Sequence, residues 1–378
     1  MDFTFSEEQN QLREEILLFA KNHLNNQEGD LSITQKMWDE AASFGLFGLS
    51  VPEEYGGLGE SYVSSAIATE TLGYGCRNNG FVFAINNHVW VGINLILLYG
   101  SEEQKKKYLA KMVQGKTIGA MAITEADAGS DAYAMRTKLR KVGDDFIVNG
   151  AKMFVSNGSL ADLFLVFAEY YEEGKRRIVA FLIEKNTPGV LVGKDIEKMG
   201  LEGCPMNEIC FQDCKVPQSN ILGKITMGES IMKSALEWER CFEFACHVGA
   251  MQRIMEECIK YSNQRRQFGK KISEYQAVSH KIANMRVDIE MSRLMLYKIA
   301  WNKDMGKNAF LEASIFKLYV SEAYIKTCQY AMQIFGAYGY TKEYGIEHEM
   351  RDALASCIYS GVNDIQRNTI FNLTNFVN

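Results

Sequence analysis

The stretch Thr117–Asp131, which reads TIGAMAITEADAGSD, marks the point where the hydrophobic pattern of the chain changes. Before it, from residue 6 to about residue 116, apolar residues recur at the spacing of amphipathic helices. From residue 117 onward, short apolar runs alternate with turn residues, which is typical of strands. The sequence therefore predicts a helical domain over residues 1–116 and a β domain that begins at residue 117.

The β domain is expected to extend to residue 222. Turn segments such as Gly143-Asp144-Asp145 and Glu172-Glu173-Gly174 separate its apolar runs, and three of the chain's four prolines lie within it or at its edge. We expect a barrel or a sandwich, with strands at residues 117–123, 137–142, 146–148, 163–168, 178–183 and 209–211.

A second helical domain is predicted over residues 223–378. The helical period is longest at residues 229–263, 274–305 and 308–335, and no proline follows Pro217, which is what uninterrupted helices require. Helices of this length bury their apolar stripes against one another or against a partner subunit.

Composition excludes several classes of function. A net charge of -6 argues against a nucleic-acid binder. We find no signal-peptide pattern and expect no 18-residue apolar span, so we predict no membrane attachment and a cytoplasmic location. The nine cysteines are scattered without a Cys-x-x-Cys pair, and the five histidines lack ligand-like spacing, so reduced thiols and no metal site are expected.

No Gly-x-Gly-x-x-Gly follows a predicted strand, so a Rossmann dinucleotide site has no support. The segment Gly56-Gly57-Leu58-Gly59 lies among helices and is interpreted as a tight turn.

Four segments carry a resemblance to a known family. They are the loop Thr124–Asp131 (TEADAGSD), Lys152–Gly158 (KMFVSNG), Arg265–Gly269 (RRQFG), and the C-terminal run Ile358–Arg367 (IYSGVNDIQR). Together and in this order they resemble the acyl-CoA dehydrogenase family of flavoproteins. The resemblance covers nearly the whole chain and implies an α+β fold: an N-terminal helical domain, a middle β domain and a C-terminal four-helix bundle.

The resemblance implies FAD as the cofactor. In the family, the loop and the segment that contains Phe154 contact the isoalloxazine ring, whereas Arg265 reaches the pyrophosphate of a neighbouring subunit's FAD. An arginine suits that role because its guanidinium donates two parallel hydrogen bonds to a fixed anion. The cofactor positions carried over are Met121, Ile123, Thr124, Gly129, Ser130, Phe154, Ser156, Arg265, Phe268, Gln276, Gln333, Gly336, Asn363 and Asp364.

The chain departs from the family pattern at several of these positions. Phe154 and Ser156 stand where tryptophan and threonine are usual, and Ala337 replaces the second glycine of a Gly-Gly pair. Val362 replaces a threonine and removes one hydroxyl. These changes affect the fine geometry of the flavin site.

The largest departure concerns the catalytic base. Many family members carry a catalytic glutamate between the tyrosine and the glycine that correspond to Tyr359 and Gly361, and here that position is Ser360. Trp238-Glu239-Arg240 is similar to the segment of a family subset whose base lies on this helix instead, so we predict that Glu239 is the base. Glu237 and Glu243 are competitors, and an ion pair between Glu239 and Arg240 is the ordinary alternative.

The chemistry also favours a buried carboxylate. Oxidation beside a thioester requires a base that removes a weakly acidic α-proton and an acceptor for a hydride, here flavin N5. On a helix Glu239 shares a largely apolar face, and burial raises the pKa of a carboxyl group. The substrate-binding residues that the resemblance implies are Ser130, Arg240, Tyr359, Ser360 and Gly361.

A closer resemblance points to a biosynthetic branch of the family that includes prolyl-carrier-protein dehydrogenases. It rests on residues 74–80 (YGCRNNG), 204–205 (CP), 238–240 (WER), 276–280 (QAVSH) and 360–361 (SG). This branch implies an aminoacyl group, prolyl first, tethered to an acyl or peptidyl carrier protein in natural-product biosynthesis.

Two other functions remain open from the sequence. The substrate could be a short or branched acyl-CoA, as in isovaleryl-type enzymes, or the chain could be a flavin-fold protein that has lost its base. The resemblance also implies a homotetramer built as a dimer of dimers, and it leaves the electron acceptor open between an electron-transfer flavoprotein and dioxygen.

Overall fold

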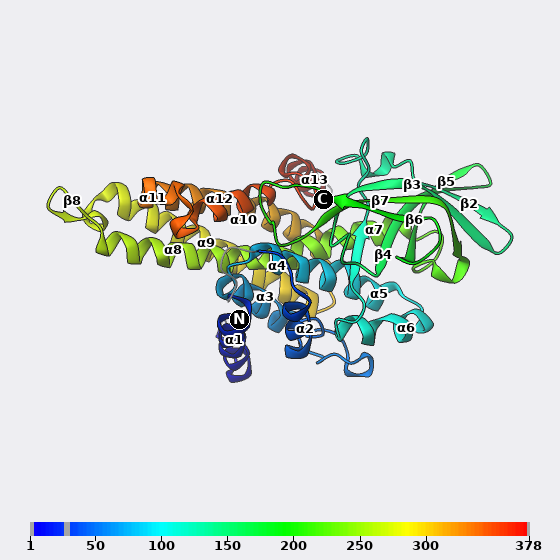
Figure 1. The fold of residues 1–378 in the computed structure, drawn as a ribbon, viewed down its shortest axis with the longest axis horizontal. Coiled ribbons are helices and arrows are strands. Elements are labelled where there is room, and N and C mark those ends of the chain that lie inside the picture. The colour runs from blue at the N-terminus through cyan, green and yellow to red at the C-terminus, as the bar shows by residue number, and fades with distance from the viewer. Residues whose placement is uncertain (1–3, 26–30, 376–378) are drawn as a thin grey trace.

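The computed structural model describes residues 4–25 and 31–375 of the chain. Figure 1 shows an elongated molecule: the strands lie at one end, long helices run to the other end, and the N-terminal helices pack beside the middle. The predicted order of helices, sheet and helices is confirmed. The outermost three residues at each terminus lie outside the described residues.

The N-terminal helices cover residues 7–113. Capping boxes form at Ser6 and Ser101, and in each the serine Oγ accepts a hydrogen bond of 3.2 Å from the backbone N–H of the glutamine three residues later. The helices are α1 (Glu7–Phe19), η1 (Ala20–Leu24), α2 (Gln35–Phe44), η2 (Glu53–Tyr55), α3 (Tyr62–Gly75), α4 (Asn79–Asn86), η3 (Asn87–Ile93), α5 (Asn94–Tyr99) and α6 (Glu102–Val113).

The expectation that the chain has no 18-residue apolar span is wrong. The continuous helical segment Asn79–Tyr99 has a mean hydropathy of 1.7 and is long enough to cross a bilayer. In the fold, however, 89% of its apolar window is buried inside the protein, as in the core helix of a globular domain. Asn86, Asn87 and Asn94 interrupt the apolar run, which is why the segment was not recognised from the sequence.

The middle domain is built on one seven-stranded sheet in the order β1-β4-β2-β3-β7-β6, with β5 paired to β4. The edge strand β6 was not predicted, because most of its residues are exposed and it lacks the buried apolar run that marks the other strands. The strands are β1 (Gly119–Ala122), β2 (Lys138–Val142), β3 (Asp145–Ser156), β4 (Leu163–Glu172), β5 (Lys175–Glu184), β6 (Val190–Asp195) and β7 (Met206–Pro217).

A buried histidine joins the sheet to the N-terminal helices. His88 Nδ1 lies 3.0 Å from the backbone N–H of Gly119, and its Nε2 lies 3.0 Å from the carbonyl oxygen of Met112. Burial lowers the pKa of His88 to about 4, so the ring is neutral and accepts at one nitrogen while it donates at the other. This contact fixes the start of β1, and therefore the loop that follows it.

The C-terminal domain is helical as predicted, but the run over residues 229–263 is not one uninterrupted α-helix. A π-helical turn, η6 (Glu239–Glu243), separates α7 (Gly228–Trp238) from α8 (Ala245–Gln264). Every residue of that turn is buried, and apolar periodicity cannot distinguish a π turn from an α turn when both sides are covered. The remaining helices are α9 (Gln276–Asp304), α10 (Phe310–Phe335), α11 (Ala337–Tyr340), α12 (Ile346–Ala355) and α13 (Asn363–Asn375).

Shorter elements complete the fold. A two-residue hairpin, β8 (Arg266–Gln267) and β9 (Lys270–Lys271), closes the far end of the long helices. Besides η2, the 3-10 turns in the described residues are η4 (Ala132–Ala134), η5 (Gln218–Asn220), η7 (Ile272–Glu274) and η8 (Lys342–Tyr344).

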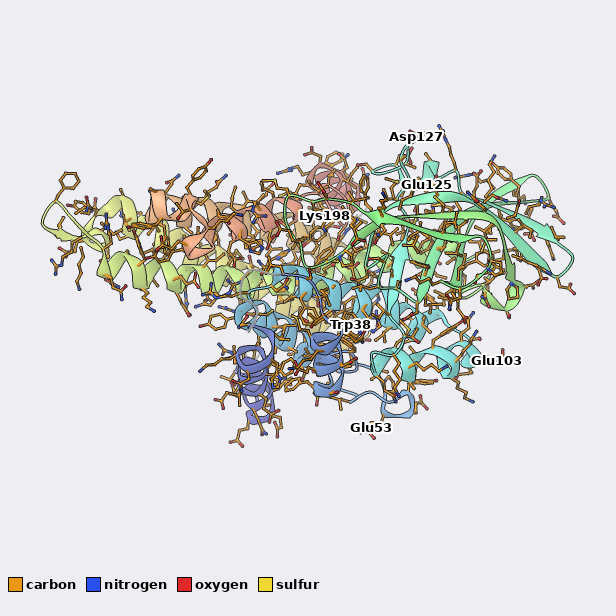
Figure 2. All side chains as sticks on the ribbon, viewed as in Figure 1. Trp38, Glu53, Glu103, Glu125, Asp127 and Lys198 are labelled. Atoms are coloured by element: carbon orange, nitrogen blue, oxygen red, sulfur yellow. The ribbon has the colours of Figure 1, made fainter. Side chains whose placement is uncertain are left out.

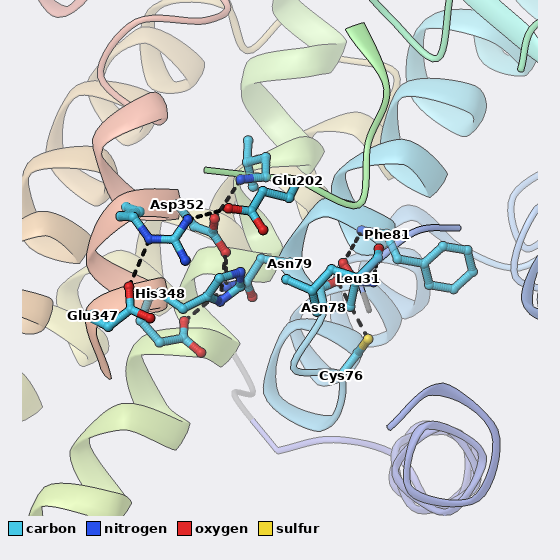
Figure 3. Close-up of polar contacts among 12 residues, drawn as sticks. Leu31, Cys76, Asn78, Asn79, Phe81, Glu202, Glu347, His348 and Asp352 are labelled. Atoms are coloured by element: carbon cyan, nitrogen blue, oxygen red, sulfur yellow. Dashed lines mark hydrogen bonds and ion pairs between the residues drawn. The ribbon is translucent and has the colours of Figure 1, made fainter. Parts of the chain in front are cut away.

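A buried polar network ties the N-terminal helices to the C-terminal bundle (Figure 3). Asn79 Nδ2 donates to Asp352 Oδ2 at 2.9 Å and to Glu349 Oε2 at 3.0 Å, and the backbone N–H of Leu201 donates to Asp352 Oδ1 at 2.6 Å. Glu349 also forms a buried ion pair with Arg253 of α8. These contacts hold α4, α8, α12 and the loop after β6 in one arrangement.

Candidate active site

The polar loop after β1 is fixed to the sheet by a buried carboxylate. Glu125 accepts hydrogen bonds from the backbone N–H of Thr137 at 3.0 Å and from its Oγ1 at 2.6 Å. It also pairs with Lys152 Nζ at 2.7 Å, and Lys152 is fully buried. Burial alone would raise the pKa of Glu125, but these donors outweigh it and the pKa is lowered. The ion pair therefore holds the loop against β3.

The outer part of this loop stands clear of the sheet. Gly129 and Ser130 are exposed and Thr124 is half-buried, whereas Glu125 is covered. Figure 2 shows Glu125 and Asp127 at the edge of the β domain, with Asp127 farther out. Met121 of β1 and Ile123, which directly follows that strand, are half-buried. The predicted flavin-contacting residues of this loop can thus be reached by a ligand.

A bulge in β3 presents an aromatic side chain next to the loop. The pairing of β3 with β7 shifts between Lys152 and Val155, and Phe154 adopts a φ of 58° with 53% of its side chain exposed. The backbone N–H of Met153 donates to the carbonyl oxygen of Thr124 at 2.8 Å, so the bulge and the loop are adjacent. A strained, exposed phenylalanine beside hydroxyl groups fits a flat aromatic ring such as the isoalloxazine of FAD.

Glu239 is the first residue of the π turn and is only 7% exposed. Its Oε2 is buried and, within the described residues, has no hydrogen-bond partner. Burial raises the pKa of Glu239, and the neighbouring Ser360 and Glu243 and the positive charges of Arg240 and Lys317 offset part of that increase. A buried carboxyl group with a free oxygen and a raised pKa has the properties of a general base.

The two competing carboxylates have different surroundings. Glu237 accepts a hydrogen bond from the backbone N–H of Ala309 at 2.8 Å and pairs with Lys303, so it is engaged in holding α7 to α9 and α10. Glu243 is 1% exposed, and burial followed by the charge of Glu239 raises its pKa well above the ordinary value. Asn87 Nδ2 donates to its Oε1 at 2.5 Å, and its Oε2 has no partner among the described residues.

The segment that carries Ser360 lies against the π turn. Arg240 Nε donates to the carbonyl oxygen of Ser360 at 2.9 Å, and Gln366 Nε2 donates to that of Gly361 at 2.8 Å. Ser360 and Gly361 have φ values of 57° and 86°, so the chain turns sharply here. Ser360 Oγ is buried without a partner in the described part of the chain. The predicted alternative, an ion pair of Arg240 with Glu239, is not among the contacts of these residues.

Two further residues at this site were not singled out from the sequence. His247 Nε2 lies 2.6 Å from the hydroxyl of Tyr359, and burial lowers the pKa of His247 to about 3, so the ring is neutral. Lys317 is fully buried on α10, and burial lowers its pKa to about 8. Neither belongs to a recognisable motif; only their burial beside charged groups identifies them.

Asn363 and Asp364 differ in their surroundings. Asn363 is buried and its Oδ1 accepts from Lys317 Nζ at 2.7 Å, whereas Asp364 is exposed and lies 3.2 Å from Arg367. Asn363 is therefore engaged inside the protein. Asp364 is accessible to a ligand at the surface.

The remaining predicted cofactor residues lie at the opposite end of the chain. Arg265 follows the end of α8, and Phe268, which is 95% exposed, lies in the turn of the β8–β9 hairpin, far from the β domain (Figure 1). The rings of Tyr261 and Phe335 stack with centroids 4.2 Å apart and bring the ends of α8 and α10 together. Gln276, Gln333 and Gly336 are exposed in the same region. The two predicted parts of the FAD site therefore lie at opposite ends of a single chain.

No group of three or more histidine, cysteine, aspartate or glutamate side chains that could hold a metal ion is found in residues 4–25 and 31–375.

Comparison with known proteins agrees with this arrangement. Models of the acyl-CoA dehydrogenase N-terminal, middle and C-terminal domains match residues 6–116, 120–214 and 226–372. An L-prolyl-[peptidyl-carrier protein] dehydrogenase of Pseudomonas fluorescens is 35% identical over 98% of both chains. The crystal structure of the prolyl acyl carrier protein oxidase AnaB is 38% identical, with a TM-score of 0.95 over 98% of this chain and 100% of that one. The FAD complex of PigA is 34% identical, with a TM-score of 0.96 over 100% of both chains.

The predicted family, cofactor and enzyme class are confirmed by these matches. The alternative of a flavin-fold protein that has lost its base has no support from them. The chain is a flavin-dependent oxidoreductase that uses FAD, and it belongs to the acyl-CoA dehydrogenase family.

Proposed function

We propose that this protein oxidises an aminoacyl group, prolyl first, that is held as a thioester on a carrier protein. The observation that carries the proposal is the buried Glu239, with a free carboxyl oxygen, at the point where Ser360 leaves room for it. The relatives named for prolyl carrier proteins over nearly their full length support this choice of substrate.

In the proposed reaction Glu239 removes the α-proton and holds it on its carboxyl group. Its raised pKa makes it a stronger base than an exposed carboxylate, and the apolar packing around the π turn keeps water away. When bound, FAD supplies the hydride acceptor at N5. The Thr124–Ser130 loop and Phe154 are the residues of this chain that would hold its ring, and the buried Glu125–Lys152 pair keeps them in place.

The experiment that tests the substrate is anaerobic bleaching of the visible flavin band. The purified holoenzyme is mixed with prolyl-loaded carrier protein or with a short acyl-CoA such as isovaleryl-CoA. We expect bleaching by the carrier-bound prolyl group only. Bleaching by the CoA thioester alone would assign the protein to acyl-CoA oxidation, and bleaching by neither would reject both substrates.

We further propose that the FAD site is completed by a neighbouring subunit, because Arg265 and the Thr124–Ser130 loop lie at opposite ends of one chain. A dimer of dimers would supply such a neighbour. We also propose that a carrier protein delivers the substrate and that the enzyme is cytoplasmic. Its electrons would pass to an electron-transfer flavoprotein or to dioxygen.

Arg265→Ala is expected to weaken FAD binding by roughly 10- to 100-fold, because a hydrogen bond to a charged group contributes about 1.5–3 kcal/mol. Fluorescence titration of the apoprotein with FAD measures the change. Arg266→Ala, an exposed arginine one residue away, is the matched control and should bind FAD normally.

Mixing subunits tests whether the site is shared. Arg265→Ala subunits refolded with Thr124→Val subunits should regain part of the FAD binding, since some sites then combine both intact halves. Absence of any recovery would mean that both residues serve the same chain's cofactor.

A further inference from the structure

The π turn holds a second buried carboxyl group that the proposed base does not explain. Glu243 lies four residues after Glu239 and is the less exposed of the two, at 1%. Carboxyl groups are almost never fully buried unless they are paired with a cation. Among the described residues, the one group that donates a hydrogen bond to the Glu243 side chain is the side-chain amide of Asn87 on η3.

The cations near the π turn are engaged elsewhere. Arg240 Nε donates to the carbonyl oxygen of Ser360, and Lys317 Nζ donates to Asn363 Oδ1. Both charges act on Glu239, whereas the charge that acts on Glu243 is the negative charge of Glu239. Within the described residues, therefore, no cation is bonded to Glu243.

The other groups that face Glu243 are neutral. Burial raises the pKa of the Cys246 thiol, and burial together with the charge of Glu243 raises that of the Tyr359 hydroxyl, so neither group is ionised at neutral pH. His247, which contacts Tyr359, is also neutral. Burial, followed by the negative charge of Glu239, raises the pKa of Glu243 well above its ordinary value.

Three buried oxygen atoms at this site have no partner in residues 4–25 and 31–375: Glu239 Oε2, Glu243 Oε2 and Ser360 Oγ. Buried polar groups in proteins are normally hydrogen-bonded, so a set of unpartnered polar atoms marks a place where a ligand can complete the hydrogen bonds. The ligand that fits two neighbouring carboxyl groups carries an N–H donor and, preferably, a positive charge.

We infer that Glu243 is a substrate-binding residue that accepts a hydrogen bond from the α-amino group of the aminoacyl thioester. This inference rests on the proposed function. In an aminoacyl thioester the nitrogen and the acidic hydrogen are attached to the same α-carbon, so two carboxyl groups on one face of a helical turn can meet both. Glu239 removes the proton from the α-carbon, and Glu243 accepts a hydrogen bond from the N–H group. If the substrate binds as an amine, its nitrogen takes the carboxyl proton of Glu243, and the ammonium so formed is the cation that the Glu243 carboxylate otherwise lacks.

The consequence is selection of aminoacyl over simple acyl groups. A ring of the same shape without nitrogen, cyclopentanecarbonyl, leaves Glu243 without the donor. Because a hydrogen bond to a charged group contributes about 1.5–3 kcal/mol, the wild-type enzyme is expected to prefer prolyl by roughly 10- to 100-fold in the rate of flavin reduction at low substrate.

The test loads the same carrier protein with prolyl or cyclopentanecarbonyl and follows anaerobic flavin reduction in wild type, Glu243→Gln and Glu243→Leu. Glutamine can still accept from Asn87 but cannot ionise. Both variants are expected to lose most of the preference for prolyl, measured as the ratio of the two rates, because any effect on Glu239 acts on both substrates and cancels in that ratio.

Glu237→Gln is the matched control. Glu237 is a buried carboxyl group on the adjoining turn, paired with Lys303, and its replacement should leave the ratio of the two rates unchanged.

A second readout does not depend on turnover. Binding of non-reactive prolyl and cyclopentanecarbonyl amides of pantetheine is measured by calorimetry, and FAD content and the thermal midpoint report whether each variant is folded.

The outcomes separate the two proposals. If prolyl-loaded carrier reduces the wild-type flavin and the variants keep the same preference in both rate and binding, the role of Glu243 is rejected and the proposed function stands. If both substrates slow equally in the variants, Glu243 acts only on the base, and the inference is also overturned. If the wild type does not react with the prolyl group, the proposed function itself fails.

Discussion

Replacing Glu239 with glutamine is expected to lower the rate of flavin reduction by the substrate roughly 10²- to 10⁴-fold, the usual contribution of a positioned general base. Glutamine has nearly the same shape but cannot accept a proton at neutral pH. The rate is measured in a single anaerobic turnover, so that reoxidation does not limit it. FAD content and the thermal midpoint should stay close to those of the wild type, because the carboxyl Oε2 has no hydrogen-bond partner to lose.

The pH dependence gives an independent check. The base acts only when it is ionised, and burial raises the pKa of Glu239 above the ordinary value of 4.5. The rate in the wild type should therefore fall as the pH decreases through a value above 4.5, and the residual rate of Glu239→Gln should lack that dependence. Turnover of the glutamine variant at the wild-type rate would show that another residue is the base.

Replacing Arg253 with methionine is expected to destabilise the protein by roughly 3–5 kcal/mol, the range found when one partner of a buried ion pair is removed. Arg253 is 7% exposed, and its partner Glu349 is 4% exposed and also accepts from Asn79 and Tyr324. The variant leaves Glu349 charged and buried between α8, α10 and α12. The midpoint of urea unfolding, followed by circular dichroism, measures the loss.

The double variant Arg253→Met/Glu349→Gln is the control, since it removes the uncompensated charge and should recover much of the lost stability. The sign of the pH effect follows from the lowered pKa of Glu349. In the wild type its contribution is present above the unfolded pKa and is lost as the pH falls through the lower, folded pKa. The loss of stability of Arg253→Met relative to the wild type should therefore become smaller in acid, where Glu349 is protonated. A deficit that is unchanged at low pH would mean that packing, rather than charge, accounts for it.

Much of the fold could be predicted because its elements depend on local pattern. The capping boxes at Ser6 and Ser101 and the change of period near residue 117 involve contacts within a few residues. The strand β6 and the π turn at Glu239–Glu243 could not be predicted. An exposed edge strand shows no apolar alternation, and a fully buried turn shows no polar face from which to count residues.

The residues of the candidate site also fall into those that the sequence could predict and those that only the structure shows. Motif order along the chain led to the family, to FAD, and to Glu239 as the predicted base in place of the residue missing at Ser360. It could not show that Glu237 is paired with Lys303, that Lys317 lies near Glu239, or that His247 contacts Tyr359. Those facts depend on residues brought together from distant elements.

The sequence by itself determined the family, the cofactor and the order of helices and strands, because these follow from residue types at fixed spacings along one chain. Only the tertiary structure decided the direction in which the pKa of each carboxyl group in the π turn is shifted. The pKa of Glu239 and that of Glu243 depend on how much water is excluded and on which cations are already hydrogen-bonded elsewhere. Those quantities exist only when the π turn, α10 and the segment that contains Ser360 are packed together.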